Sequence, residues 1–307
     1  MNERAAAPAV PIDPDAVPRD DSAASNPLPQ EQPMTTTDHL VETTHAAISV
    51  RERTGSGGPT VVFIHGNSSC KEIFREQFAA PELARMRLVA FDLPGHGASQ
   101  DARAPETSYQ IAGYAAMTEE LLAKLGVERP LIVGWSLGGH IALEMIGRGF
   151  RAAGVLISGT PPIQPSIECL MRAFNIDPAA ENLTGKRDFT DQDALMYATA
   201  TSATDGGLDA HFLAAAKRTD GRAREIMFGS VATGAPLDEQ AIVASMTVPL
   251  AIVNGEGDLF VRHDYFGTIS YGSLWPHGVV TMAGAGHAPF LQTPRAFNAL
   301  LAEFAAG

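Results

Sequence analysis

Six short apolar runs, each bounded by turn-forming residues, constrain the fold of this chain more than any other feature. They are rich in β-branched residues and do not alternate with polar ones, which is typical of strands buried on both faces. Segments with helical spacing lie among them, so the pattern predicts an α/β fold, a mostly parallel sheet with helices on both sides. The predicted strands are TVVFI (60–64), RLVAF (87–91), LIVGW (131–135), GVLIS (154–158), LAIVN (250–254) and GVVTMA (278–283), and the predicted helical segments are 71–85, 109–125, 137–149 and 293–305.

The alternation of strands and helices breaks between Pro161 and about residue 245. No strand-like run occurs there, and helical pieces carry aromatic and methionine side chains that look exposed. Because the stretch follows a strand end, we expect a helical lid over the functional site, at about residues 163–245. The side chains concerned are Met171, Phe174, Met196, Tyr197, Phe212, Met227 and Phe228.

The N-terminal segment, residues 1–33, is rich in Pro, Ala and acidic residues and poor in large apolar ones. Such a composition predicts disorder, and we expect a dispensable tail or an over-long gene start. The first strand-like pattern appears in 34–50, so we place a disordered extension at 1–40 and one folded domain at 41–307. The segment has no apolar signal-peptide core, and no apolar run reaches the roughly 20 residues of a membrane span. We therefore expect a cytoplasmic protein without a membrane partner.

The composition also narrows the possible partners. The net charge of −13 argues against nucleic acid or an anionic membrane, and leaves a small neutral molecule as the expected partner. The two cysteines, Cys70 and Cys169, lie far apart and form no metal-binding pattern. We expect them to be free thiols in a reducing compartment. The oligomeric state is left open.

One serine lies in the frame expected of a nucleophile. Ser136 occupies the centre of a G-x-S-x-G pattern, Gly134 to Gly138, directly after a predicted strand and at the start of a predicted helix. This context is typical of a nucleophile elbow, a strained turn that holds the hydroxyl above the sheet. The N–H of Leu137 would then face a developing oxyanion. The alternative is a serine that caps the helix.

Two further loops supply candidate partners for this serine. Asn67 follows the predicted strand 60–64, where such folds place the second oxyanion donor, although it could serve only the turn. His287, in GAGHAPF after the last predicted strand, is the candidate general base. Of the other histidines, we expect His65 to support its loop, and we expect the ring of His140 to point away from the site.

Two acids, Glu256 and Asp258, follow the penultimate predicted strand in NGEGD. Either one satisfies the chain order serine, acid, histidine. Gly255 must turn the chain out of the sheet, so Glu256 would lie on the outgoing limb and face solvent. Asp258 can fold back towards His287, and we assign it as the acid that fixes the imidazole tautomer.

Taken together, the motifs HGN, FDLPGHGAS, GWSLGG, NGEGD and GAGHAPF resemble those of the α/β-hydrolase family over residues 45–307. The segments HGNSS, GWSLGGHIALEMI, SGTPP and RTDGRAR resemble the serine-dependent N-acylhomoserine lactonases of that fold. The resemblance implies hydrolysis of neutral lactones with an acyl tail, without a metal or another cofactor. It implies the following residues: Ser136, Asp258 and His287 as the triad, Asn67 and Leu137 as oxyanion donors, and Asn67, Trp135 and Tyr197 as substrate contacts.

Two other functions remain compatible with the motifs. A general carboxylesterase acting on small acyl esters would use the same triad and differ only in its pocket. A ligand receptor built on a hydrolase scaffold could keep the triad without turning over substrate. A zinc lactonase is disfavoured because its H-x-H-x-D-H motif is absent from the sequence.

Overall fold

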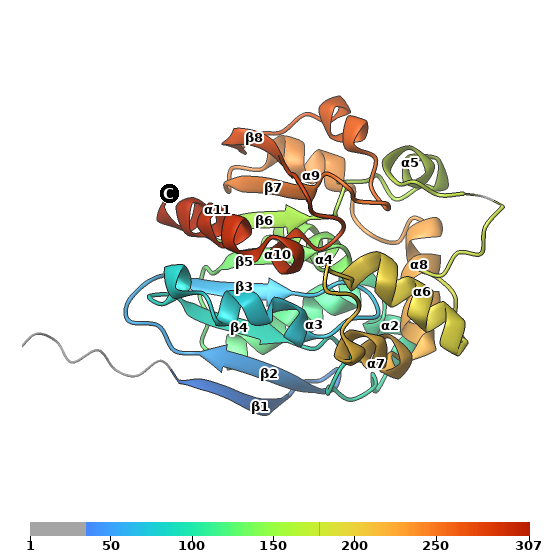
Figure 1. Ribbon diagram of the computed structural model, residues 1–307, viewed down its shortest axis with the longest axis horizontal. Coiled ribbons are helices and arrows are strands. Elements are labelled where there is room, and N and C mark those ends of the chain that lie inside the picture. Colours follow the sequence, from blue (N-terminus) through green and yellow to red (C-terminus); the bar gives the residue numbers. More distant parts are fainter. Residues whose placement is uncertain (1–34, 178) are drawn as a thin grey trace, which may run out of the picture. The chain divides into compact units, whose positions relative to one another are not determined.

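The computed structural model describes residues 35–177 and 179–307, which fold around one eight-stranded sheet (Figure 1). The strand order is β1-β2-β4-β3-β5-β6-β7-β8. β1 and β2 pair antiparallel, β2 joins β4 antiparallel, and the remaining neighbours are parallel. The strands are β1 Thr36–Glu42, β2 Ala47–Arg53, β3 Thr60–Ile64, β4 Arg87–Phe91, β5 Leu131–Trp135, β6 Gly154–Ser158, β7 Leu250–Gly255 and β8 Leu274–Met282.

All six predicted strands are present, and the predicted mostly parallel sheet is confirmed. The start of the sheet differs from the expectation. Residues 36–40, which we assigned to the extension, belong to β1 and pair with β2 along its full length. The side chains of this edge strand are mostly exposed, so it lacks the apolar run that marks a buried strand. The predicted disorder of residues 1–33 lies outside the described residues.

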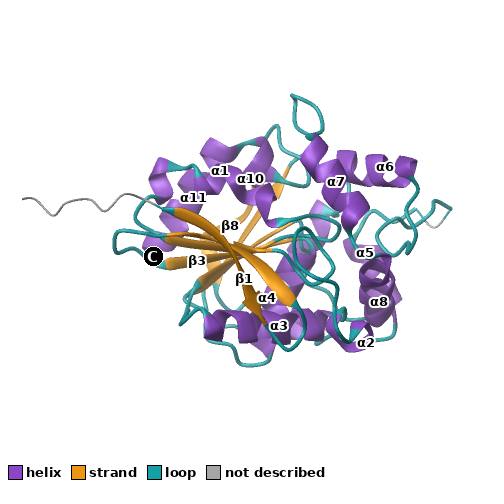
Figure 2. Cartoon of the chain, turned by 90° about the horizontal axis from the view of Figure 1, so that it is seen from below, coloured by secondary structure: helices purple, strands orange, loops and turns teal. Residues whose placement is uncertain are grey.

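Helices cover both faces of the sheet (Figure 2). α1, α10 and α11 lie on one face, and α3 and α4 lie on the other. The predicted helical segment 71–85 is broken into three short pieces, because Pro81 cannot continue a helix. The helices are η1 Lys71–Phe74, α1 Arg75–Phe78, η2 Pro81–Leu83, α2 Pro105–Ser108, α3 Ile111–Lys124, α4 Leu137–Gly147, α5 Ile167–Ala173, α6 Asp191–Ser202, α7 Ala210–Arg218, α8 Gly221–Ala232, α9 Glu239–Ser245, η3 His263–Thr268, α10 Pro289–Gln292 and α11 Pro294–Ala306.

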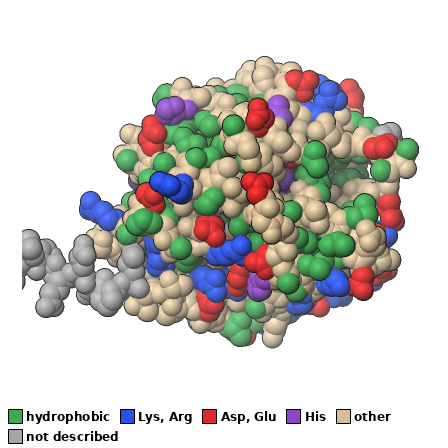
Figure 3. Space-filling model, in the orientation of Figure 1, with side chains coloured by type: hydrophobic (Ala, Val, Ile, Leu, Met, Phe, Trp, Pro, Cys, Tyr) green, Lys and Arg blue, Asp and Glu red, His purple; other side chains and the backbone are tan. Residues whose placement is uncertain are grey.

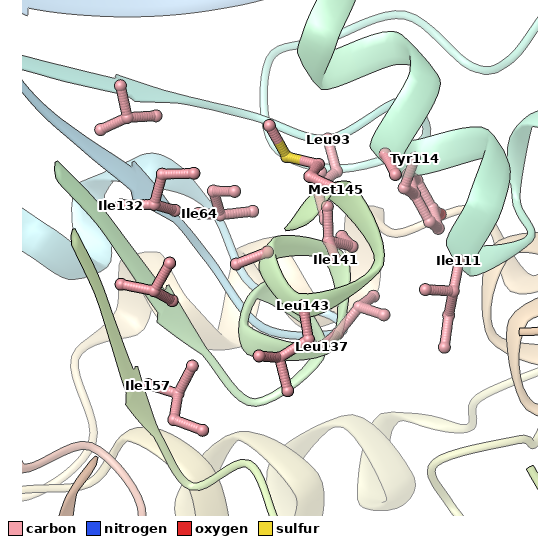
Figure 4. Close-up of a cluster of buried hydrophobic side chains, with 14 of the residues drawn as sticks. Ile64, Leu93, Ile111, Tyr114, Ile132, Leu137, Ile141, Leu143, Met145 and Ile157 are labelled. Atoms are coloured by element: carbon pink, nitrogen blue, oxygen red, sulfur yellow. The ribbon is translucent and has the colours of Figure 1, made fainter. Parts of the chain in front are cut away.

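Successive residues of the central strands supply two separate hydrophobic cores. In β3, Val62 and Ile64 belong to the cluster beneath α3 and α4, whereas Val61 and Phe63 belong to the cluster beneath α11. Figure 4 shows the first cluster, in which side chains of α4 lie among those of α3 and of the sheet. A strand that is apolar at every position therefore reflects burial on both faces.

The segment between β6 and β7 forms five helices, α5 to α9, and contains no strand of the sheet. Most of these helices gather at the end of the sheet towards which the parallel strands point (Figure 1). The side chains that looked exposed in the sequence divide into three groups, of which one, Phe174 and Phe228, is half-buried. Tyr197, Phe212 and Met227 are buried, whereas Met171 and Met196 are exposed.

The described surface carries charges of both signs. Acidic and basic side chains are interspersed with apolar ones over the face shown in Figure 3. None of the helices in the described ranges is long and apolar enough to cross a membrane.

Candidate active site

Ser136 lies in the sharp turn between β5 and α4, as its motif predicts. Its backbone angles are φ 53° and ψ −118°, a left-handed conformation that costs free energy for a residue with a side chain. Its hydroxyl makes no capping hydrogen bond to the helix, so the alternative of a helix cap is wrong. The hydroxyl borders a cavity instead.

The glycines around Ser136 are required by close packing. A Cβ atom on Gly134 would lie 2.5 Å from the carbonyl oxygen of Gly138, and one on Gly138 would lie 2.0 Å from that of Ile64. A Cβ on Gly66 would meet the Ser136 Cβ at 3.1 Å. The elbow is therefore pressed against the end of β3, which brings the loop containing Asn67 next to the nucleophile.

His287 and Asp258 form a buried pair. Nδ1 of His287 lies 2.8 Å from Oδ2 of Asp258, and Oδ1 of Asp258 accepts the N–H groups of Phe260 at 2.8 Å and Val261 at 3.4 Å. Burial alone would raise the pKa of Asp258, but the His287 charge and these hydrogen bonds together lower it. Because an ionised Asp258 accepts the Nδ1 proton, Nε2 is left as the basic atom of His287. Glu256 is exposed, so the structure pairs the histidine with Asp258.

The loops that carry the acid and the histidine are bonded to each other. The N–H of Glu256 donates to the carbonyl of Met282, and that of Gly257 donates to Ala285. A Cβ on Gly255 would lie 2.0 Å from the carbonyl oxygen of Gly286. Gly255 therefore serves the close approach of the two loops.

Trp135 does not lie where the sequence interpretation placed it. Its side chain is 1% exposed and belongs to the core beneath α11, away from the described residues that line the cavity. Its Nε1–H donates to the carbonyl oxygen of His287 at 2.7 Å. Trp135 thus fixes the loop of His287 by a hydrogen bond from the core. The expectation that Trp135 contacts substrate is wrong for this cavity.

The two expected oxyanion donors lie beside the serine. Leu137 is the first residue of α4, so its N–H has no partner within the helix. Asn67 follows β3 and is buried, and it lines the same cavity as Ser136. Its side chain is engaged, because Nδ2 donates to the carbonyl of Thr184 at 3.0 Å and Oδ1 accepts from Ser68.

The cavity at Ser136 has a volume of about 370 Å³, a size typical of small-molecule sites. Residues of the inserted helices form much of its wall, and most of them are apolar. Tyr197 lies in this wall beside Thr184 and Asn67, and burial raises the pKa of its hydroxyl to about 12. The insertion contributes the apolar or aromatic residues Ile163, Leu170, Phe174, Ile176, Ala180, Leu183, Met196, Tyr197, Ala200, Met227, Phe228 and Val231 and the polar residues Asn175, Asp177, Glu181, Asn182 and Thr184, and the sheet domain adds the apolar residues Ile111, Leu137 and Phe260.

The sequence predicted that His65 and His140 lie away from the site, and this prediction is wrong for His140. His65 supports its loop: Nδ1 lies 2.7 Å from the carbonyl of Gly66, and Nε2 accepts the N–H of Leu93. His140 lines the cavity, against the expectation that its ring points away. It pairs there with Glu239, a partner from α9 that sequence spacing could not reveal.

Among the described residues, one group of side chains has donor atoms close enough for a metal ion. The ligand atoms of Cys70, Glu72 and His211 all lie within 4.8 Å of one another. However, Lys71 Nζ is 3.0 Å from Glu72, and burial raises the pKa of the Cys70 thiol. A protonated thiol and a competing ammonium group are a poor donor set for a cation. Both Cys70 and Cys169 are free thiols, as expected.

Comparisons with known proteins show the family to which this fold belongs. Residues 61–300 match the alpha/beta hydrolase family. The structure of a variant of the N-acyl homoserine lactonase AidH, complexed with N-hexanoyl homoserine, is similar with a TM-score of 0.83 and 40% identity over 88% of this chain and 96% of that chain. The pimeloyl-[acyl-carrier protein] methyl ester esterase of Sodalis glossinidius is 27% identical over 82% of this chain and 96% of its own length. The AB hydrolase superfamily protein YisY of Bacillus subtilis is 24% identical over 87% and 98%.

The chain therefore belongs to the alpha/beta hydrolase family, as its motifs indicated. Its fold and its relatives make it a hydrolase.

Proposed function

We propose that this protein opens the lactone ring of N-acylhomoserine lactones, and so degrades quorum signals, through a covalent acyl-enzyme. The observation that carries the proposal is the Ser136 elbow facing an apolar cavity that also contains His287 and Asn67. The 40% identity to a lactonase over nearly the whole described chain supports the same substrate class.

The reaction would proceed in two halves. His287 Nε2 takes the proton of Ser136 as the hydroxyl oxygen attacks the lactone carbonyl, and the N–H groups of Asn67 and Leu137 stabilise the oxyanion. Collapse of the intermediate breaks the ring ester bond, and His287 returns the proton to the departing ring oxygen. Water, deprotonated by His287, then attacks the acyl-enzyme and releases the N-acylhomoserine carboxylic acid.

The cavity wall suits the two ends of such a substrate. The apolar side chains of the insertion would bury the acyl tail, which contributes about 0.8 kcal/mol per methylene. Tyr197 and Asn67 are polar residues that line the cavity together with Ser136, and we propose that they orient the substrate amide, which would compete with Thr184 and Ser68 for the Asn67 side chain. The insertion would act as a lid whose helices exclude water from the reacting atoms.

The proposal requires no metal, so activity should be unchanged by chelators.

The second candidate is a carboxylesterase that acts on acyl esters. The 27% identity to a methyl ester esterase over most of both chains favours it. The two functions share the triad and differ in whether the pocket holds the lactone ring and its amide.

A comparison of substrates distinguishes them. We expect kcat/KM for N-hexanoyl homoserine lactone to exceed that for methyl hexanoate by at least about 100-fold, because the ester lacks the amide that the site would orient. Equal values, or faster cleavage of the ester, would favour the esterase and contradict the lactonase.

A further inference from the structure

A second histidine–acid pair lies in the wall of the same cavity. His140 is on α4, one turn after Ser136, and its Nδ1 lies 2.8 and 3.0 Å from the two carboxylate oxygens of Glu239. Glu239 is only 1% exposed, and its Oε2 also accepts the N–H of Ile163 at 2.9 Å. The triad does not use this pair.

The hydrogen bonds of the pair leave one ring atom available. Because a carboxylate accepts the hydrogen bond, Nδ1 of His140 carries the proton. Nε2 of His140 makes no hydrogen bond to any residue within 35–177 and 179–307. It is also not one of the fully buried polar atoms that lack a hydrogen-bond partner. Since His140 borders the cavity, Nε2 is the atom that a ligand can reach.

The surroundings of His140 make this polar atom unusual. The ring centroid of Phe174 lies 6.1 Å from that of His140, and Leu170 and Met227 line the same cavity. A ligand that enters the cavity displaces water from Nε2, so a ligand that supplies a hydrogen-bond donor there would be bound in preference to one that leaves the atom unpaired.

The position of His140 fits one part of the proposed substrate. It lies four residues along α4 from Ser136, a rise of about 6 Å. Five bonds separate the attacked lactone carbon from C3 of the acyl chain, a comparable span. An oxygen at C3 would therefore come within reach of Nε2 when the carbonyl carbon is at Ser136.

We infer that His140, oriented by Glu239, accepts a hydrogen bond at Nε2 from a hydroxyl at C3 of the acyl chain, so that 3-hydroxyacyl homoserine lactones are the preferred substrates. This inference rests on the proposed function and specifies its substrate. His140 is the specificity-determining contact, and Glu239 is a positioning residue.

The test is the ratio of kcat/KM for 3-hydroxyhexanoyl homoserine lactone to kcat/KM for hexanoyl homoserine lactone; the 3-oxo compound, whose C3 oxygen has no proton to donate, is the substrate control and should react like the hexanoyl compound. We expect a ratio of about 10 in the wild type, since one hydrogen bond in a protected site is worth about tenfold. His140→Phe, which keeps an aromatic ring beside Phe174, should bring the ratio to about 1. His140→Gln should retain part of the preference and serves if the first variant does not fold. Glu239→Gln should give an intermediate ratio.

The matched control is His277→Phe. His277 pairs with Glu303 at 2.8 Å on the exposed side of β8, so its loss should leave the ratio unchanged. A wild-type ratio near 1, or a ratio that His140→Phe does not alter, would show that the pair only joins α4 to α9 and would overturn the inference. If the wild type opens no lactone but cleaves an aryl ester, the proposed function itself fails, and the inference fails with it.

Discussion

At the scale of single residues, the catalytic machinery depends on atoms that pack against the imidazole of His287. Gly159, at the end of β6, has a φ of +61°, and a Cβ there would lie 2.6 Å from Cε1 of His287. The ring centroid of Phe260 also lies 4.6 Å from that of His287. The base is thus held between a glycine and an aromatic ring, which allows it little freedom.

Substitution of Gly159 should impair catalysis more than folding. We expect Gly159→Ala to lower kcat by about 100-fold, because a displacement of the base by about 1 Å has this order of effect. The control is Gly278→Ala, which has a similar φ of +68° but nothing within 4 Å of the added atom. Both variants should lose a comparable amount of thermal stability. Equal loss of kcat in the two would show that backbone strain, and not contact with His287, is responsible.

The choice between the two acids gives a second test at this scale. Asp258→Asn should lower kcat by about 10⁴-fold, because the remaining amide would favour the wrong imidazole tautomer. Glu256→Gln should leave kcat within about twofold of the wild type, because Glu256 is exposed. Steady-state hydrolysis of an aryl ester measures both, and the reverse order of effects would refute the assignment of Asp258.

The positions of Ser136, Asp258 and His287, the proposed triad, could be predicted from the sequence because each follows a strand that the pattern already defines. The roles of Glu239 and Thr184 could not be predicted, because both residues lie in the insertion, where helices without a sheet give no register. Trp135 was misplaced for a related reason. Its neighbour Ser136 faces the cavity, but the sharp turn sends the indole to the opposite side.

At the scale of elements, Arg224 on α8 joins the insertion to the loop that carries Asn67. Its guanidinium donates to the carbonyls of Lys186 and Arg187 at 2.7 Å each and lies 3.8 Å from the ring of Phe189. A weaker contact of 3.3 Å reaches the hydroxyl of Ser68. These contacts of Arg224 explain part of the RTDGRAR motif, because they stabilise one wall of the cavity.

Loss of the Arg224 contacts should make the cavity wall less rigid. We expect Arg224→Leu to lower the free energy of unfolding by about 2–4 kcal/mol, because two partly buried hydrogen bonds from a charged donor are lost. KM should rise more than kcat falls, since the triad residues lie on other elements. Arg187→Leu, which removes only an exposed ion pair with Glu225, should cost about 0–1 kcal/mol. Urea unfolding and steady-state kinetics check both variants, and an equal cost would refute the role of Arg224.

At the scale of the whole molecule, resistance to acid depends on a buried ionic group near the start of η1. Lys71 Nζ lies 2.9 Å from Oδ2 of Asp92 and 3.0 Å from Oε1 of Glu72. Burial opposes ionisation of Glu72, but the charge and hydrogen bond of Lys71 outweigh it and lower the pKa of Glu72 to about 2.

The sign of the pH effect follows from this lowered pKa. In the unfolded chain a glutamate has a pKa near its usual value of about 4.5, so Glu72 stabilises the fold fully above that pH. Its contribution is lost as the pH falls from about 4.5 to about 2. Lys71→Met should reduce this part of the pH dependence and lower the free energy of unfolding at pH 7 by about 3–5 kcal/mol, because a buried carboxylate loses its partner.

The control for this prediction is Lys124→Met. Lys124 is exposed and pairs with Glu120 at 3.6 Å one helical turn away, so its loss should cost only about 0.3–0.5 kcal/mol. Urea unfolding at pH 3 and pH 7 measures both variants. If the free energy of unfolding changed between pH 7 and pH 3 by the same amount in Lys71→Met as in the wild type, the role assigned to the Lys71–Glu72 pair would be contradicted.

The central claim is that Ser136 opens a lactone, and proton release measures this most directly. Each ring opening yields one carboxylic acid, so an unbuffered solution of N-hexanoyl homoserine lactone should acidify steadily with the wild type. Ser136→Ala, compared at equal concentration, should lower the rate by at least about 10³-fold. Acidification that persists in Ser136→Ala would contradict a serine nucleophile, and its absence in both proteins, with rapid cleavage of an aryl ester by the wild type, would contradict the lactonase.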